Sequence, residues 1–268
     1  MLALLDSARL VFHDARVMSI ARRYLRPSPF LIALLAGIAA GCAGTAVAPE
    51  HPEPTPPDET ASVGIVVFED EIVLNGWLFG AQNDAVVILS HMRPSDQTAW
   101  FDFAHVLADN GYAALTFDFR GYGDSDGGQD FDKLDDDLSA AVRYMRDRGK
   151  QKIFLVGASM GGTASLVVAA QEDVAGVVAI SAPAQFTVQD ALSAVPSVTE
   201  PKLFIASEDD TAAMVDLEEL LTASSAPKES EVYTGNAHGT DLFQRDQSDH
   251  ADAVEDLILR FLRDHGGS

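Results

Sequence analysis

The chain has 268 residues, and 47% of them are hydrophobic, which is enough for a buried core and excludes a protein that is disordered throughout. Its 41 acidic and 18 basic residues give a formal net charge of −23 at pH 7. An electrostatic field of this sign repels phosphate groups, so we expect no nucleic acid partner and no electrostatic attraction to anionic surfaces.

The first 42 residues have the layout of an export signal. Three arginines precede a short apolar run at residues 30–40, and these are Arg22, Arg23 and Arg26. Small residues and then Cys42 follow the run. A charged region, an apolar region and small residues in this order are typical of secretory signals. The apolar run is about 11 residues long, and a membrane-spanning helix needs roughly 20.

This segment resembles the bacterial lipoprotein signal, in which the cysteine is lipidated and becomes the first residue after cleavage. The resemblance implies a signal peptide over residues 1–41, with Met18 as an alternative start. It also implies a lipid on Cys42, which is the single cysteine of the chain. Ala39 departs from the pattern, which prefers a larger aliphatic residue there. In the alternative interpretation, residues 30–40 are an uncleaved anchor and Cys42 is a free thiol.

A proline-rich segment follows the cysteine. Residues 45–60 contain acidic and small residues together with five prolines, which are Pro49, Pro52, Pro54, Pro56 and Pro57. This composition predicts an extended tether rather than a packed element. We therefore expect a signal peptide at residues 1–41, a lipidated tether at 42–61 and one folded domain at 62–268.

The folded domain begins with two β-rich runs, at residues 64–68 and 72–79, which predict a short hairpin. Short apolar runs then alternate with helix-like segments, and these runs cover residues 86–90, 113–117, 153–156, 174–180, 203–206 and 231–233. Continuous apolar strands that alternate with helices favour a mostly parallel sheet covered on both faces. The sequence thus predicts an α/β fold with a doubly wound sheet of about eight strands.

Three of the helices can be predicted in some detail. Residues 98–109 place Phe101, His105 and Ala108 at helical spacing on one expected core face. Residues 130–148 start acidic and end basic, which suits the helix dipole, and the acidic run 135–137 is expected to be a solvated face. Residues 251–262 form the last helix.

Ser159 is a candidate nucleophile. It lies within Gly157-Ala158-Ser159-Met160-Gly161, between a predicted strand and a predicted helix. G-x-S-x-G in this context indicates a nucleophile elbow, a tight turn that presents the serine hydroxyl above a sheet. The glycines allow the strained turn to form without side-chain collisions. The pentapeptide alone is weak evidence, so the interpretation depends on its surroundings.

Three further segments make residues 62–264 resemble the α/β-hydrolases. Ser90-His91-Met92-Arg93-Pro94 follows the third predicted strand, where that family has its oxyanion loop. Residues 118–125 follow the fourth strand and are similar to the family's D-x-R-G-x-G-x-S turn, so Asp124 and Ser125 are interpreted as structural. Asn236-Ala237-His238-Gly239 follows the last strand, where the family's catalytic histidine lies. The resemblance implies the α/β-hydrolase fold with a minimal cap domain or none.

A serine hydroxyl is a poor nucleophile at neutral pH, so catalysis needs a base and a carboxylate that orients the base. In this fold the chain order is serine, acid, histidine, which implies Ser159 as nucleophile and His238 as base. The family's G-x-x-D pattern selects Asp210 as the acid, with Asp209 as the reserve and Glu208 third. Each of these residues also has a structural interpretation. In it, Ser159 is a serine in a turn, Asp209 and Asp210 form an acidic helix cap, and His238 is a surface residue.

Two backbone N–H groups are expected to bind the oxyanion of the tetrahedral intermediate. One belongs to Met160, and the resemblance implies that the other belongs to Arg93, with Met92 as the reserve. Met92 departs from the family, which usually has glycine at that position. His91 is expected to hold this loop through hydrogen bonds. The side chain of Arg93 could attract an anionic group of a substrate, or it could be an ordinary solvent-exposed arginine.

The expected function is therefore that of an exported, lipid-anchored serine hydrolase of the bacterial cell envelope that cleaves carboxylic esters through an acyl-enzyme. No cofactor is needed, and no His, Cys or Asp cluster has metal-ligand spacing, so we expect no metal. Only about twenty residues separate Ile180 from Lys202. This leaves no room for a large lid, so an open site that takes small or extended esters is expected.

Other functions share these residues. A peptidase, thioesterase, acyltransferase or perhydrolase would use the same triad. A dehalogenase or epoxide hydrolase needs an aspartate nucleophile and a dienelactone hydrolase needs a cysteine, so Ser159 disfavours those three. The alternative from another class is a noncatalytic surface binding protein built on the same scaffold.

Overall fold

The computed structural model describes residues 61–67 and 70–266. The expected signal peptide, Cys42 and nearly all of the expected tether lie outside these residues. Within the described part of the chain, none of the helices combines the length and the apolar composition that a membrane crossing requires.

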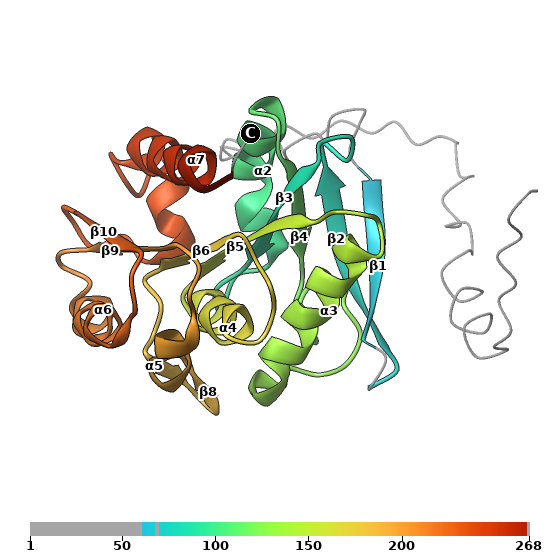
Figure 1. Ribbon diagram of the computed structural model, residues 1–268, viewed down its shortest axis with the longest axis horizontal. Helices are drawn as coiled ribbons and strands as arrows, with labels where there is room; N and C mark the ends of the chain where they lie inside the picture. The colour runs from blue at the N-terminus through green and yellow to red at the C-terminus, as the bar shows by residue number, and fades with distance from the viewer. Residues whose placement is uncertain (1–60, 68–69, 267–268) are drawn as a thin grey trace, which may run out of the picture. The chain divides into compact units, whose positions relative to one another are not determined.

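One eight-stranded sheet organises the domain (Figure 1), in the order β1-β2-β4-β3-β5-β6-β9-β10. Its strands are β1 (Ala61–Val67), β2 (Ile72–Phe79), β3 (Ala85–Ser90), β4 (Ala113–Phe117), β5 (Lys152–Ala158), β6 (Gly176–Ile180), β9 (Lys202–Ser207) and β10 (Lys228–Tyr233). The β1–β2 and β2–β4 pairs are antiparallel, and every pair from β4 to β10 is parallel. The expected mostly parallel sheet of about eight strands is confirmed.

Helices cover both faces of this sheet (Figure 1), as expected because its central strands β4, β3, β5, β6 and β9 are buried along nearly their whole length. One face carries α3 (Leu134–Arg146), α4 (Met160–Ala169) and α6 (Thr211–Ala223), and the other carries α2 (Phe101–Asp109) and α7 (Ala251–Gly266). Each layer has its own apolar core, one built around α3 and α4 and one around α2 and α7. All ten residues of α4 are buried, because this helix follows the central strand β5 and packs between its neighbours.

The segment between β6 and β9 is small, as its length predicted. It contains the two-residue strands β7 (Gln185–Phe186) and β8 (Gln189–Asp190), the single turn α5 (Ala191–Ala194) and the 3-10 helix η3 (Val195–Ser197). Elsewhere in the described residues, short 3-10 helices are η1 (Gln97–Trp100), η2 (Phe131–Lys133) and η4 (Gly239–Phe243). The cap is therefore a hairpin and a turn rather than a lid domain.

Two finer expectations are wrong. Helix α2 buries Phe103, Ala104 and Leu107, whereas the expected core face containing His105 is only partly buried. The second concerns Asp137 in the acidic run of α3, which is fully buried instead of solvated. Its carboxylate accepts hydrogen bonds from the Arg120 guanidinium at 2.6 to 3.1 Å. The basic partner comes from the turn after β4, a contact that local sequence does not reveal.

The turn at residues 118–125 is a structural joint, as interpreted from the sequence. Ser125 Oγ donates to the Asp118 carbonyl at 2.6 Å and accepts from the Asn75 N–H at 2.9 Å. Arg120 also pairs with Asp70 at 2.7 Å. The turn thus joins β4 to the amino-terminal hairpin and to α3.

Candidate active site

The expected site residues follow three parallel strands of the sheet. Ser159 comes directly after β5, Asp210 lies three residues after β9, and His238 lies five residues after β10. Parallel strands end at the same edge of a sheet, and this edge is where such folds build their sites. The topology therefore brings three segments that are far apart in the chain to one edge.

The backbone at Ser159 has the strain of a nucleophile elbow. Its φ of 50° and ψ of −119° lie in a region that residues with a side chain rarely adopt. A Cβ at Gly157 would lie 2.2 Å from the carbonyl oxygen of Gly161, and a Cβ at Gly161 would lie 2.4 Å from that of Ser90. The Ser159 side chain makes no capping bond to α4. Both glycines are thus sterically required, and the hydroxyl is not used to cap the helix.

His238 and Asp210 are directly bonded. Asp210 Oδ2 is 2.5 Å from His238 Nδ1, and Asp210 Oδ1 accepts a bond from the Ala213 N–H at 3.4 Å. The His238 side chain is 39% exposed and that of Asp210 is 13% exposed. The ring is therefore accessible from solvent, while the carboxylate behind it is shielded. Glu208 and Asp209 are both exposed.

Two buried serines hold the histidine loop from either side. Ser207 Oγ donates to the Ala237 carbonyl at 2.7 Å, and the Gly239 N–H donates to Ser181 Oγ at 3.1 Å. Ser181 itself has a positive φ of 48°. These serines end β9 and follow β6, so the sheet positions His238 through its two neighbours in the chain. Sequence reasoning missed both, because nothing local distinguishes them from other serines.

The histidine loop lies against the elbow. A Cβ at Gly239 would be 3.3 Å from the Ala158 Cβ and 2.7 Å from the Met92 sulfur. The residue after His238 thus contacts the residue before Ser159 and also the loop after β3. Met92, which stands where glycine was expected, is buried and fills the space beside Gly239.

His91 holds the loop after β3, as expected. Its Nε2 accepts from the Phe119 N–H at 3.1 Å, so its Nδ1 carries the proton and donates to the Met92 carbonyl at 2.9 Å. The rings of Phe119 and Tyr122 pack edge-on against it. Burial lowers the pKa of His91 from 6.5 to about 4, despite the opposing effect of the Met92 carbonyl. His91 is therefore a neutral structural residue at ordinary pH.

The two expected oxyanion donors lie at the same edge. Met160 is the first residue of α4, so its N–H has no acceptor within the helix. The carbonyls of Ser90 and His91 approach Gly161 so closely that only glycine fits there. The loop that carries the exposed Arg93 thus packs directly on the elbow.

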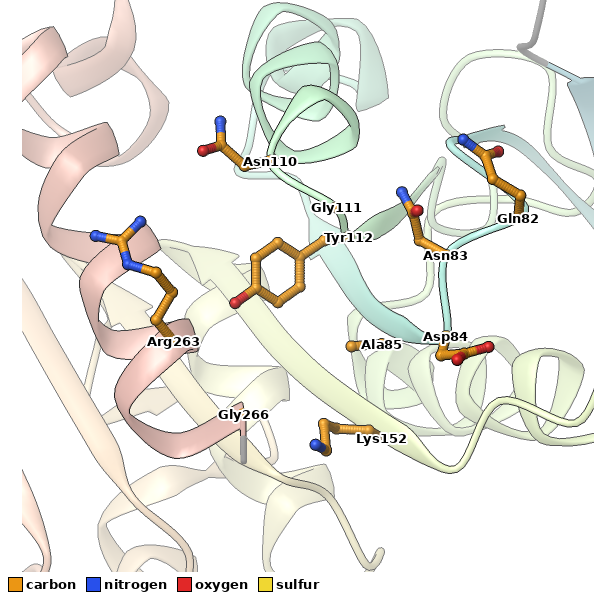
Figure 2. Close-up of a pocket in the computed structure, with 10 residues that line it drawn as sticks. All are labelled: Gln82, Asn83, Asp84, Ala85, Asn110, Gly111, Tyr112, Lys152, Arg263 and Gly266. Carbon is orange, nitrogen blue, oxygen red and sulfur yellow. The ribbon is translucent and has the colours of Figure 1, made fainter. Parts of the chain in front are cut away.

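Over the described ranges, no group of three or more His, Cys, Asp or Glu residues is arranged to hold a metal ion. A pocket of about 670 Å³ lies at the other end of the strands, where Ala85 starts β3 and Lys152 starts β5. Figure 2 shows Tyr112 between Arg263 of α7 and Asn83. Seven residues of extended strand, or about 23 Å, separate Lys152 from Ser159, so this pocket is not part of the candidate site.

Comparison with known proteins supports the assignment of the fold. The family described as serine aminopeptidase, S33 matches residues 81–198, which is less than half of the chain and includes Ser159 but neither Asp210 nor His238. The uncharacterised protein YfhR of Salmonella typhimurium is 30% identical over 115 residues, which cover 40% of this chain and 39% of YfhR. The chain therefore aligns with about two fifths of the length of that curated relative.

Solved structures match over more of the chain. An esterase from Pyrococcus furiosus superposes with a TM-score of 0.66 at 22% identity, covering 78% of this chain and 92% of the esterase. A dienelactone hydrolase from Anabaena variabilis gives a TM-score of 0.64 at 24% identity, covering 77% of this chain and 97% of that protein. The sheet order, the elbow between β5 and α4 and these superpositions show that the chain has the α/β-hydrolase fold.

Proposed function

We propose that this protein is a serine hydrolase that cleaves carboxylic esters, with Ser159 as nucleophile, His238 as general base and Asp210 as the acid that orients the base. The observation that carries the proposal is the 2.5 Å contact between Asp210 Oδ2 and His238 Nδ1, on a loop that packs against the strained elbow of Ser159. Structural roles alone would not require a histidine–carboxylate pair beside such an elbow.

The proposed reaction has two halves. His238 takes the proton of Ser159 as the hydroxyl oxygen attacks the ester carbonyl, and the protonated ring then gives that proton to the departing alcohol. A water molecule, deprotonated by the same ring, next attacks the acyl-serine and releases the acid. Asp210 stabilises the charged ring throughout. The N–H groups of Met160 and Arg93, with Met92 as the reserve donor, stabilise the oxyanion in both halves.

Open access favours small or extended esters as substrates. The segment between β6 and β9 is a hairpin and one helical turn, and the His238 side chain is 39% exposed. A site gated by a large lid would shield this ring. The esterase neighbours share only the fold at their level of identity, so the acyl and alcohol groups have to be found by assay.

A peptidase is the second candidate, because the matching family is described as a serine aminopeptidase. A peptidase with this fold would use the same nucleophile and base. Rates on 4-nitrophenyl esters and on aminoacyl 4-nitroanilides, measured with the same preparation, separate the two reactions.

A fluorophosphonate probe tests the proposal and its noncatalytic alternative. We expect the probe to modify Ser159, and we expect the Ser159→Ala variant to fold but to lose both labelling and ester hydrolysis. Thr163→Ala, one turn further along α4, is a matched control for a small change in the same helix and should still be labelled. A folded wild-type protein that is neither labelled nor active would instead indicate a binding protein.

The sequence also leads us to propose where the enzyme acts. The segment ending at Cys42 supports export and a lipid anchor at the bacterial cell envelope, with the tether holding the domain away from the membrane. Ester substrates would then reach the site from outside the cell membrane.

A further inference from the structure

The side chain of Arg93 extends from the loop after β3 toward aromatic residues of two other segments. Its guanidinium carbon is 5.7 Å from the centre of the Phe131 ring, in η2. Phe131 in turn packs edge-on against Phe186 of the cap hairpin, with ring centres 5.4 Å apart. Arg93 is exposed and both rings are half-buried. A cation and two accessible aromatic rings thus form a continuous surface, which we call the Arg93 rim.

This rim spans the elbow. In the sheet, β5 lies between β3, which leads to Arg93, and β6, which leads to Phe186. Gly161 of the elbow packs on the carbonyls of Ser90 and His91, and a Cβ at Gly162 would lie 2.8 Å from that of Ala182. The two chain segments that contribute to the rim therefore contact the first turn of α4 from its two sides, next to Ser159.

The positive charge of the rim is not neutralised by a salt bridge among the described residues. In the described part of the chain Arg93 forms no salt bridge, whereas Arg120, Lys133 and Arg245 each pair with an aspartate. The Tyr122 hydroxyl is buried close to the Arg93 side chain. Burial raises the pKa of Tyr122, and the positive charge of Arg93 and a hydrogen bond from its side chain oppose part of this effect. A guanidinium has five N–H donors, so Arg93 keeps donors for an anionic group beside this contact.

The neighbouring carboxylates are engaged elsewhere. Asp96 accepts from the Thr98 N–H at 2.9 Å, and Asp118 accepts from the Gln97 N–H at 2.9 Å and from its side-chain amide at 2.7 Å. The chain has a net charge of −23, and Arg93 places on this surface a positive charge that forms no salt bridge within the described residues. It is also the feature that would let an anionic substrate approach against the repulsion of the whole molecule.

We propose that Arg93 recognises a carboxylate on the substrate, so that the preferred substrates are esters which carry a free acid group together with an apolar or aromatic part. This rests on the proposed esterase function and names its substrate class. The guanidinium binds the carboxylate through charge-assisted hydrogen bonds, and Phe131 and Phe186 contact the apolar part. Arg93 then sets specificity with its side chain while its backbone N–H serves the oxyanion.

Matched ester pairs test this directly. On the acyl side, mono(4-nitrophenyl) adipate is compared with 4-nitrophenyl hexanoate, and on the alcohol side 4-acetoxybenzoate is compared with its methyl ester. The readout is the ratio of kcat/KM for the anionic and the neutral member, after subtraction of the rate with the Ser159→Ala variant. We expect Arg93→Gln to lower this ratio by about tenfold or more in at least one pair, and Arg93→Lys to lower it less.

Arg148→Gln is the matched control. Arg148 also stacks on an aromatic ring, at 3.4 Å from the centre of Tyr144, but it follows α3 near the amino end of β5, at the other edge of the sheet. The Arg148→Gln substitution removes one positive charge, as Arg93→Gln does, and should leave the ratio of kcat/KM values unchanged. Thermal unfolding shows whether each variant is folded.

The two levels of the proposal fail in different ways. If wild-type protein hydrolyses the neutral esters through Ser159 but the ratio is the same in wild type and in both folded Arg93 variants, the substrate inference is wrong and the esterase remains. If wild-type protein hydrolyses neither pair, the esterase proposal fails and the inference fails with it. An equal loss of ratio in Arg148→Gln would also overturn it, since the effect would then come from net charge alone.

Discussion

At the scale of single residues, the Asp210 carboxylate makes two different contacts, one with each of its oxygens. One oxygen caps the first turn of α6 through Ala213, and the other contacts the His238 ring. A helix cap is worth about 1 kcal/mol, whereas an acid that orients a catalytic histidine affects the rate by several orders of magnitude. Measurements of stability and of ester hydrolysis can therefore distinguish the capping role from the proposed catalytic role.

We expect Asp210→Asn to reduce kcat for an ester by on the order of 10⁴-fold, because asparagine offers the ring a donor where an acceptor is needed. Asparagine is also a good cap, so the melting temperature should change little. The comparison is with Asp209→Asn, the neighbouring exposed acid, which should keep most of the wild-type kcat. A larger loss in Asp209→Asn than in Asp210→Asn would reverse the assignment of the acid.

The buried His91 ring should make the free energy of unfolding depend on pH. Its folded-state pKa of about 4 lies below its ordinary value of 6.5, so between these values the unfolded chain takes up a proton that the folded chain does not. The stabilising effect of the buried neutral ring is thus complete above pH 6.5 and is lost as the pH falls toward 4. The full effect on the free energy of unfolding is about 3 kcal/mol.

Denaturant unfolding of wild type and His91→Asn measures this contribution. We expect wild type to be the more stable protein at pH 7 and the difference between the two to shrink steadily down to pH 4.5. A difference that stays constant over this range would show that the His91 ring is not the group that titrates.

At the scale of elements, the elbow couples β5, α4 and the loop after β3 through contacts that admit no side chain. A Cβ at position 161 would meet backbone oxygens at 2.4 and 2.7 Å, and backbone atoms cannot rotate away as a side chain can. Only a shift of the whole loop could relieve such a clash. That shift would displace Arg93 and the oxyanion donors with it.

Gly161→Ala should therefore lower the free energy of unfolding by several kcal/mol, about 2 to 4, and abolish ester hydrolysis. Gly128→Ala is the control, because a Cβ there would meet nothing within 4 Å and its φ is not positive. That variant should stay within about 0.5 kcal/mol of wild type and remain active. Equal melting temperatures for Gly161→Ala and wild type would contradict the packing described for the elbow.

At the scale of the whole molecule, the expected lipid anchor is testable without reference to the folded domain. Mature protein from a bacterial host should begin at Cys42, carry the added mass of its acyl groups and partition with membranes. Cys42→Ala should block lipidation and leave an unprocessed precursor. Intact-mass spectrometry distinguishes these forms, and a wild-type chain that retains residues 30–40 would show that they are an uncleaved anchor instead.

Local sequence determined most of the elements and was enough to propose Ser159, Asp210 and His238 as site residues. The apolar run at 113–117 is β4 residue for residue, and the glycines around Ser159 predicted the turn that the structure contains. These features are local, because burial on both faces and a strained turn each restrict the residues at the position itself. The edge strand β10 was recognised only over its last three residues, since Lys228, Glu229 and Ser230 are exposed and carry no apolar pattern.

Tertiary structure alone decided how distant segments meet. It placed β4 between β2 and β3 and buried Asp137 against Arg120. It also brought Ser181 and Ser207 into hydrogen-bond contact with the loop of His238. It likewise brought the exposed Arg93 guanidinium over the Phe131 ring. Such pairings depend on which surfaces pack together after the sheet forms. The sequence around a polar residue does not indicate whether its hydrogen-bond partner is water or a distant side chain.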